Sequence, residues 1–386
     1  MKAPMGMGTD FFLRDETGKA GKGGDLVLFV IFLVLGLIGL IMVYSASSTL
    51  AGKHYGDSAY FLKKQLLWTV FGIGLFLFLS QFDYRRLREA LIPLTLIVFT
   101  LLISVLLFGR KVGGATRWLR FGPITFQPSE LAKLFVVIYL AHYIAKKGDS
   151  LSDFWKGLWP SLVMLGLLCL LILKEPDLGT TIMIGIIAVL LLFIGGVSPR
   201  HLAWLSGSMI PVVGYALLRH DYMLQRIKTY INPSMVSPAK SFQINQSYIA
   251  LGSGGISGMN LGEGRQKLFF LPEPHTDFIF SVIGEELGWL GTCCVILLFV
   301  SLLWKGAQIT REVRDPFAQM LAMGMTLLIV MPALMNMGVV TGLLPTKGLS
   351  LPFISYGGSS LLMNWAAAGV LYRISKEVPV RPSRKL

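Results

Sequence analysis

The residue of this sequence that is best placed to act as a base is Asp277, the last polar residue of the stretch LPEPHTD. It is followed directly by Phe278 and further apolar residues. A carboxylate at the border of apolar surface loses solvation, so its pKa is expected to rise, and such a group can take a proton from a hydroxyl. Glu273 and His275 are close enough in sequence to position it. The alternative is that Asp277 only caps the helix that follows.

A second candidate site is the basic stretch 109–128, which contains no acidic residue. Its cations are Arg110, Lys111, Arg117 and Arg120. Short outer loops of membrane proteins rarely carry so many cations, and the guanidinium group forms a two-pronged hydrogen bond with phosphate. The stretch therefore fits a cradle for a diphosphate. The alternative is interfacial anchoring, in which the Arg side chains reach lipid headgroups and Trp118 joins the aromatic belt.

Two further acidic motifs follow this stretch. Glu130 and Lys133 are three residues apart, on one face of a predicted helix. An ionisable residue inside a membrane helix is expected to have a function, although the two side chains could instead form an ion pair that only fixes packing. In KEPDLGTT, Glu175 and Asp177 stand at the start of a helix, with Pro176 expected in its first turn. Simple capping is the alternative to a role in substrate binding.

Two loops add weaker candidates. The glycine-rich stretch GSGGISGMNLGEG, at 252–264, could present backbone N–H groups to an anion, but it lacks the context of a nucleotide-binding loop and could equally be a flexible lid. Lys267 follows it. The last outer loop, LLPTKGLSLPFISYGGSS, is predicted to have an irregular backbone covered by protein or water. It contributes Ser355 and Ser359. Deeper in the chain, Glu285 is expected to pair with a buried cation.

The elements that position these residues are long apolar helices. The chain has 386 residues, of which 54% are hydrophobic and 15% charged, and a membrane span needs about 20 mostly apolar residues. Ten segments meet this description: 26–45, 65–81, 90–108, 129–145, 158–173, 178–196, 201–218, 278–304, 317–342 and 357–374. We therefore predict an all-α polytopic membrane protein of about ten spans.

The distribution of Lys and Arg predicts the orientation of these spans. Ten spans put both termini on one side, and the short segments on that side are rich in Lys and Arg, which places them in the cytoplasm. The predicted organisation is a cytoplasmic tail at 1–25, one transmembrane domain at 26–374 and a second cytoplasmic tail at 375–386. Between spans seven and eight, one long extracytoplasmic loop covers 219–277.

The formal net charge of +14 limits the partners. The cations are not clustered on a soluble module, so nucleic acid is not an expected partner. Cytoplasmic loops attracted to anionic membrane lipid explain about half of the excess, and an anionic substrate would explain the rest. No spacing typical of a metal site is present, so no cofactor is expected apart from a divalent cation such as Mg or Mn.

At the level of whole motifs, the sequence resembles the SEDS family of bacterial shape, elongation, division and sporulation proteins. The matching stretches are GGATRWLRFGPITFQPSELAK, KEPDLGTT, FQINQSYIALGSGGISGMNLGEG, LPEPHTDFIFSVIGEELG and LPTKGLSLPFISYGGSS, which run from about 113 to 360 in the order of the family. The forms LPTKG and EPDLGT resemble the division branch more than the elongation branch.

The resemblance implies a peptidoglycan glycosyltransferase that polymerises lipid II, with inversion, at the outer face of the cytoplasmic membrane, and in the division branch at the septum. It implies Asp277 as the catalytic residue, and it matches the family's loop Arg and Trp to Arg117 and Trp118 and its buried pair to Glu130 and Lys133. On this basis we expect Arg117, Lys133 and Lys267 to stabilise the departing diphosphate. It also implies a class B penicillin-binding protein and other division proteins as partners. The substrate-binding candidates are Arg117, Trp118, Glu130, Lys133, Asp177, Lys267, His275, Ser355 and Ser359.

Two other functions remain open at this level. A transporter that flips lipid II would also use many helices and a buried cation such as Lys133, but it needs a polar path through the whole bilayer, whereas the charges gather on the outer side. A scaffold that only activates a penicillin-binding protein would need no catalytic Asp277.

Overall fold

The computed structural model describes residues 24–112, 115–122, 124–219, 224, 230–231, 238–268, 271–345 and 348–379. The parts of the two predicted tails at 1–23 and 380–386, and several stretches of the predicted long loop, lie outside these residues. Everything below refers to the described part of the chain.

Ten long helices account for most of the described chain, and each coincides with one of the apolar segments expected from the sequence. They are α1 (Leu26–Tyr55), α2 (Tyr60–Leu79), α4 (Leu91–Phe108), α5 (Pro128–Lys147), α6 (Trp159–Lys174), α7 (Leu178–Ile194), α8 (Pro199–Arg219), α11 (Ile279–Glu312), α12 (Pro316–Val340) and α13 (Gly358–Ser375). Short helical pieces lie between some of them: α3 (Arg86–Glu89), η1 (Gly148–Ser152) and η2 (Phe154–Leu158).

The membrane character of the fold follows from these helices, while the number of spans stays a prediction. Six helical segments are long and apolar enough to cross a membrane, and α7 is apolar but shorter. Helix α5 falls outside this group because Glu130 and Lys133 lie near its start and Lys146 and Lys147 at its end. Large apolar side chains such as Phe108 and Trp304 are exposed on the outside of the bundle, as expected for a surface in contact with lipid.

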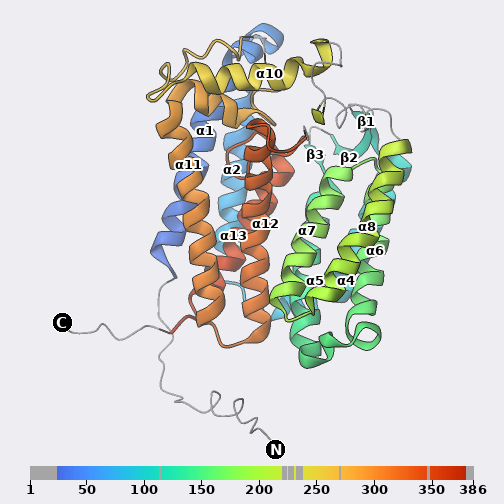
Figure 1. Ribbon diagram of the computed structural model, residues 1–386. Coiled ribbons are helices and arrows are strands. Elements are labelled where there is room, and N and C mark those ends of the chain that lie inside the picture. Colours follow the sequence, from blue (N-terminus) through green and yellow to red (C-terminus); the bar gives the residue numbers. More distant parts are fainter. Residues whose placement is uncertain are drawn as a thin grey trace, which may run out of the picture.

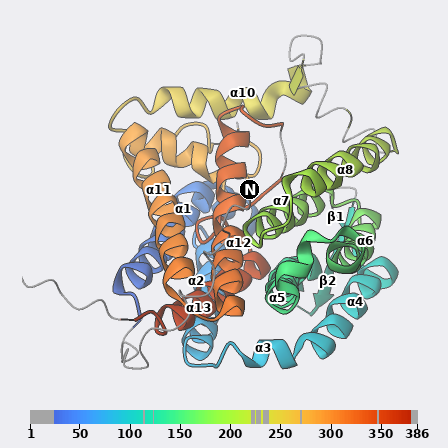
Figure 2. The same ribbon diagram turned by 60° about the horizontal axis from the view of Figure 1, so that its bottom comes forward.

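The helices form an elongated bundle with α12 near its centre (Figures 1 and 2). Helices α1, α2, α11 and α13 lie on one side of α12, and helices α4, α5, α6, α7 and α8 lie on the other (Figure 2). Helix α12 packs directly against α5, α7, α11 and α13. Of its most apolar 18-residue stretch, 78% is buried inside the protein. The core of the bundle is therefore built around one helix that touches both halves.

The first and last described helices have their free ends at the same end of the bundle. The backbone N–H of Asp25, just before α1, donates to the hydroxyl of Ser375 at the end of α13, over 3.1 Å. The Asp25 carboxylate also pairs with Lys305 on α11 at 2.9 Å. This geometry is what a chain with both termini on one side requires. That the side is cytoplasmic stays a prediction.

Two elements differ from what the sequence predicted for the loops. The basic stretch expected to be a loop forms a three-stranded antiparallel sheet of β1 (Arg110–Val112), β2 (Ala115–Phe121) and β3 (Ile124–Phe126). The predicted long loop contains a helix, α10 (Pro238–Ser253), which lies across the upper end of the bundle (Figure 1). Both were missed because they are too short or too polar to show as apolar runs.

Close packing of α1 against the last outer loop gives a first testable prediction. A Cβ atom added at Gly39 would stand 2.2 Å from the carbonyl oxygen of Phe353, so the helix and the loop backbone would have to separate. We expect Gly39→Ala to destabilise the protein by about 1–3 kcal/mol, the usual cost of overpacking, visible as a lower Tm in detergent. Gly74→Ala is the matched control, because a Cβ at Gly74 of α2 meets nothing within 4 Å. Equal Tm values for the two variants would contradict this packing.

Candidate active site

The segment that carries Asp277 is fastened to the rest of the protein by three consecutive carbonyl groups. The carbonyl of His275 accepts the backbone N–H of Tyr356 at 2.9 Å, and that of Thr276 accepts the hydroxyl of Ser355 at 2.5 Å. The carbonyl of Asp277 accepts the side-chain amide of Asn336 at 2.8 Å. All three bonds use backbone atoms of the segment, so they fix its course without using the Asp277 carboxylate.

Asp277 itself is half-buried and lies two residues before Ile279, the first residue of α11. A Cβ atom added at Gly348 would stand 2.8 Å from its Oδ2, so the carboxylate lies against the bare backbone of the last outer loop. Helix α11 begins at Ile279, and its N-cap residue is Phe278, without a side-chain cap. Asp277 therefore stands one residue before the cap position.

His275 is held among aromatic rings, and its backbone takes part in the fastening of the segment. Its ring centre lies 4.5 Å from that of Phe61 and 5.7 Å from that of Tyr356. Burial lowers the pKa of His275, and the nearby Glu273 opposes this shift. The ring is thus expected to be neutral near pH 7. Through its backbone and packing, His275 helps to hold the Asp277 segment, and a role in binding substrate stays a prediction.

The last outer loop, here called the bridge segment (348–359), joins the Asp277 segment to the β-sheet. At one end Ser355 binds Thr276, as described above, and accepts the backbone N–H of Leu351 at 2.8 Å. At the other end the hydroxyl of Ser359 accepts the backbone N–H of Gln127 at 3.1 Å and donates to the carbonyl of Thr125 at 3.4 Å. Both serine candidates thus bind protein groups and hold this connection.

Beyond the bridge segment lies a charged group that we call the Arg117 cluster: Arg117, Gln127, Glu175 and Asp177. Arg117 on β2 donates to the carbonyl of Pro176, and its Nε lies 4.0 Å from the Asp177 carboxylate. Gln127 donates to the same carboxylate at 3.3 Å. The structure therefore brings the basic stretch and the KEPDLGTT motif together, which their separation in sequence did not show.

Asp177 also caps α7, as the simpler interpretation of its motif predicted. Its carboxylate accepts the N–H of Thr180 at 3.1 Å and the hydroxyl of Thr180 at 2.8 Å. The helix begins at Leu178, so Pro176 precedes the cap and does not occupy the first turn as expected. On β2, Trp118 follows Arg117 and points to the opposite face of the strand. In the register of the sheet, the Cα atom of Trp118 is the partner of that of Arg110 on β1.

Glu130 and Lys133 form the predicted ion pair in the first turns of α5. The Lys133 ammonium lies 2.9 Å from Glu130, and both residues are only 9% exposed. Pro128 is the first residue of α5, as its missing N–H favours. The pair is therefore a structural feature of the helix. A role in binding substrate stays a prediction.

Lys267 is separate from these groups and already has a partner. Its ammonium lies 2.5 Å from the Glu286 carboxylate on α11 and donates to the hydroxyl of Ser45 on α1 at 3.0 Å. Lys267 and Glu286 are 4% and 0% exposed. The structure thus gives Lys267 the role of tying the loop to α1 and α11, and does not bring it to the Arg117 cluster. Glu285, expected to pair with a cation, instead accepts the backbone N–H groups of Arg265 and Gln266.

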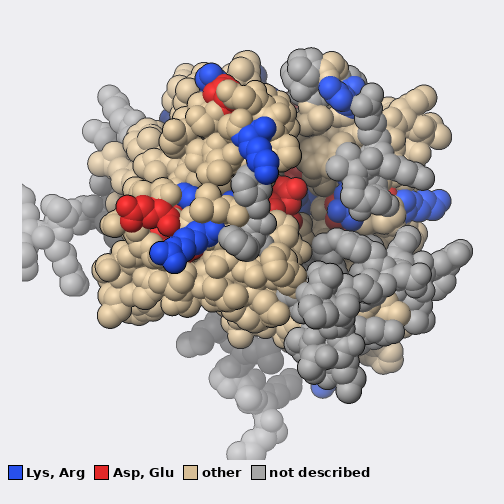
Figure 3. Space-filling model, turned by 90° about the horizontal axis from the view of Figure 1, so that it is seen from above, with Lys and Arg blue, Asp and Glu red and all other residues tan. Residues whose placement is uncertain are grey.

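All of these groups lie at one end of the bundle, the upper end in Figure 1. Seen from above, the visible Lys, Arg, Asp and Glu side chains lie mainly in a band across the middle of the face (Figure 3).

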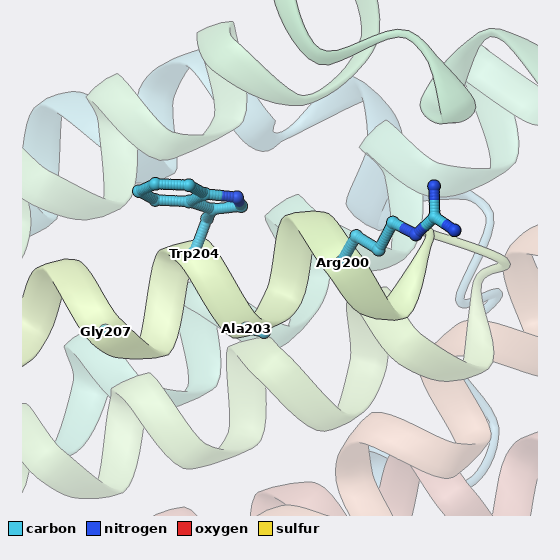
Figure 4. Close-up of a pocket in the computed structure, with 4 residues that line it drawn as sticks. All are labelled: Arg200, Ala203, Trp204 and Gly207. Carbon is cyan, nitrogen blue, oxygen red and sulfur yellow. The ribbon is translucent and has the colours of Figure 1, made fainter.

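A separate hollow of about 660 Å³ is lined by Arg200, Ala203, Trp204 and Gly207 on one side of α8. Arg200 and Trp204 project from the same side of that helix (Figure 4). It lies near the start of α8, away from the upper end, and has no part in the site.

Two residues at this end were missed as site residues or left without a role. Asn336 binds the carbonyls of both Asp277 and Leu349, the latter at 2.6 Å, and its signal was an amide side chain deep in the apolar run of α12. Glu175 is fully buried, which its sequence context did not show. Within the described ranges, no group of three or more His, Cys, Asp or Glu side chains is arranged to hold a metal ion.

Comparison with known proteins shows which family this chain belongs to. The profile of a family described as cell cycle proteins, which includes FtsW, RodA and SpoVE, matches residues 25–379. A relative from Geobacter metallireducens, "Probable peptidoglycan glycosyltransferase FtsW", is 42% identical over 93% of this chain and 96% of its own. "Stage V sporulation protein E" of Bacillus subtilis is 40% identical over 91% of this chain and 97% of its own.

Solved structures agree with the sequence comparison. A chain of a complex described as "a peptidoglycan synthase complex", with "structural coordination of polymerization and crosslinking", superposes with a TM-score of 0.73 at 25% identity, over 92% of this chain and 98% of that chain. The rod shape determining protein RodA of Thermus thermophilus superposes with a TM-score of 0.65 at 25% identity, over 93% and 99%. The chain therefore belongs to the SEDS family of cell cycle proteins.

Proposed function

We propose that this chain polymerises lipid II into glycan strands at the outer face of the cytoplasmic membrane, as a peptidoglycan glycosyltransferase of septal wall synthesis. The class of reaction is that of its relatives, which are named peptidoglycan glycosyltransferases and are about 40% identical over nearly the whole chain. The observation that carries the site is the Asp277 segment, fastened through three consecutive carbonyls. A base must be held in place relative to the proton that it removes.

The proposed step is an inverting transfer. The free 4-hydroxyl of a lipid II acceptor gives its proton to the Asp277 carboxylate as its oxygen attacks the anomeric carbon of the donor. The donor is the growing chain on its own lipid diphosphate. A new C–O bond forms at the anomeric carbon, the bond to the diphosphate oxygen breaks with its electron pair, and the lipid diphosphate leaves as an anion.

Arg117 and Lys133 would stabilise that departing charge. Cations that are already in place when charge develops contribute strongly to transition-state stabilisation. Arg117 is bound to the carbonyl of Pro176 and lies near the Asp177 carboxylate, so it is oriented before substrate arrives. A divalent cation, if used, would depend largely on oxygens of the substrate diphosphate, because Mg²⁺ is commonly held by one or two carboxylates together with phosphates.

A class B penicillin-binding protein is the proposed partner. The solved neighbour belongs to a synthase complex that coordinates polymerization with crosslinking. Polymerisation alone leaves uncrosslinked strands, so a transpeptidase in the same complex would complete the product. Other division proteins and a location at the septum are proposed from the names of the relatives alone.

The test is a polymerisation assay with purified protein and its penicillin-binding partner in liposomes, supplied with fluorescent lipid II. The partner should have no transferase activity of its own. Glycan ladders on gels that require this chain are the expected result. Lipid II that moves between leaflets without ladders would instead support a flippase. Ladders absent under all partner and metal conditions, together with crosslinking by the partner only when this chain is present, would support a scaffold.

A further inference from the structure

Glu175 is a buried acid whose carboxylate oxygens have no hydrogen-bond partner. It lies in the turn between α6 and α7 and is 0% exposed. Neither Oε1 nor Oε2 has a partner within the described residues. Buried polar side chains nearly always have partners, and each exception needs an explanation. An ionised carboxylate in this position would be costly, whereas a protonated one costs far less.

The surroundings of Glu175 decide which form is present. Burial and the Asp177 carboxylate together raise the pKa of Glu175 to about 8, against the opposing effect of Arg117. Two further ion pairs at this end, Glu130 with Lys133 and Lys267 with Glu286, are each neutral as a pair. Lys174, the last residue of α6, is exposed to the outside. Near pH 7, Glu175 is therefore expected to be mainly a neutral carboxylic acid.

The charge of Glu175 determines the net charge of the Arg117 cluster. With Glu175 protonated, the cluster holds one cation, Arg117, and one anion, Asp177. With Glu175 ionised, the cluster carries a net negative charge. An anion that approaches the Arg117 side chain, which is 33% exposed, meets no net charge in the first state and a net negative charge in the second, so only the second state repels it.

We propose that Glu175 is a positioning residue that stays protonated and so keeps the Arg117 cluster receptive to the diphosphate of the lipid substrate. This inference rests on the proposed function for the identity of the substrate. The residue does not touch the substrate in this arrangement. It acts through Arg117. Because the protonated acid is neutral, it adds no second negative charge to the cluster.

The consequence is a loss of diphosphate affinity at alkaline pH. As pH rises through the pKa of Glu175, the carboxylate ionises and the site repels the substrate. We expect KM for lipid II to rise about tenfold between pH 7 and pH 9 in the wild type, with a smaller change in kcat. Glu175→Gln, which imitates the neutral acid, should keep the wild-type KM at pH 7 and show no such rise.

The experiment compares wild type, Glu175→Gln and the control Glu263→Gln at each pH. Glu263 is an exposed acid at the same end of the bundle, so its variant should follow the wild type. Comparison at each pH removes contributions from the substrate and from other titrating groups. Equal pH profiles in the wild type and Glu175→Gln would overturn the proposal. So would a large rise in KM for Glu175→Gln at pH 7, because it would mean that the ionised form is needed.

A second measurement needs no turnover and separates this inference from the proposed function. Farnesyl diphosphate serves as the probe, and binding is measured as the increase in Tm that it causes. The increase should be smaller at pH 9 than at pH 7 in the wild type, and equal at both in Glu175→Gln. If this pattern holds while no glycan ladders form, the proposed function fails and the diphosphate site stands. If the probe does not stabilise the wild type at pH 7, the inference fails.

Without any ligand, Glu175→Gln should be at least as stable as the wild type. A raised pKa means that the folded state favours the protonated acid, so the stability that Glu175 contributes is lost as pH rises from about 4.5 to about 8. The Gln variant avoids this loss. A markedly lower Tm for the Gln variant at pH 8 would therefore contradict a neutral, unpartnered Glu175.

Discussion

Replacement of Asp277 by Asn is expected to lower the rate of glycan polymerisation by about 10²–10⁴-fold, the usual contribution of a positioned general base. Asn has nearly the same shape but cannot take the proton from the acceptor hydroxyl. The three hydrogen bonds that fasten the segment use the carbonyls of 275–277. The segment should therefore keep its course, and the loss should fall on kcat.

The control for this variant is Asp57→Asn. Asp57 is an acid in the turn between α1 and α2 whose side chain is 40% exposed, and it pairs with Lys63 at 2.8 Å. Its variant should polymerise at the wild-type rate. Both variants should express, bind the penicillin-binding partner and unfold at the wild-type Tm. Wild-type ladders from Asp277→Asn would keep the transferase function but remove Asp277 as its base.

Replacement of Lys267 by Met is expected to destabilise the protein by about 3–5 kcal/mol, the cost of leaving a buried charge without its partner. The charge left behind would be Glu286, which is 0% exposed and bound by Ser45 at 2.7 Å. The measurement is the thermal unfolding of the purified protein in detergent. The double variant Lys267→Met with Glu286→Gln should recover much of the loss, because no buried charge then remains unpaired.

An exposed ion pair provides the matched control. Lys63→Met breaks the pair with Asp57, whose side chains are 70% and 40% exposed, and should cost less than about 1 kcal/mol. The experiment also decides between two roles of Lys267. If Lys267→Met unfolds like the wild type but loses polymerisation, Lys267 binds substrate and its pairing with Glu286 is secondary.

The sequence predicted the helices well because each is a long apolar run. Apolar length is a strong signal that needs no tertiary information. The Glu130–Lys133 pair was also predictable, since spacing of three residues fixes both on one helix face. The partner of Lys267 was not predictable. Glu286 is 19 residues away in sequence, and pattern alone does not show which loop cation meets a buried acid.

The sheet and α10 show why short elements were missed. In β2, the order Thr116-Arg117-Trp118-Leu119-Arg120-Phe121 does not alternate polar with apolar residues, so it lacks the two-residue period that indicates a half-buried strand. The abundance of charge in this stretch drew attention to chemistry instead. The meeting of Arg117 with Asp177, like the contact of Asn336 with Asp277, depends on how distant segments fold together. Such contacts require the structure.

The bridge segment has a consequence for control of the reaction. The proposed base belongs to the side of the bundle that holds α11, whereas the proposed anion-binding cation is on β2, which packs against α4 and α5. Ser355 and Ser359 bind one side each. The distance between proton acceptor and leaving group is thus set by how the two halves stand relative to each other. A protein that binds only one half of the bundle could change the rate of synthesis without contacting a reacting atom.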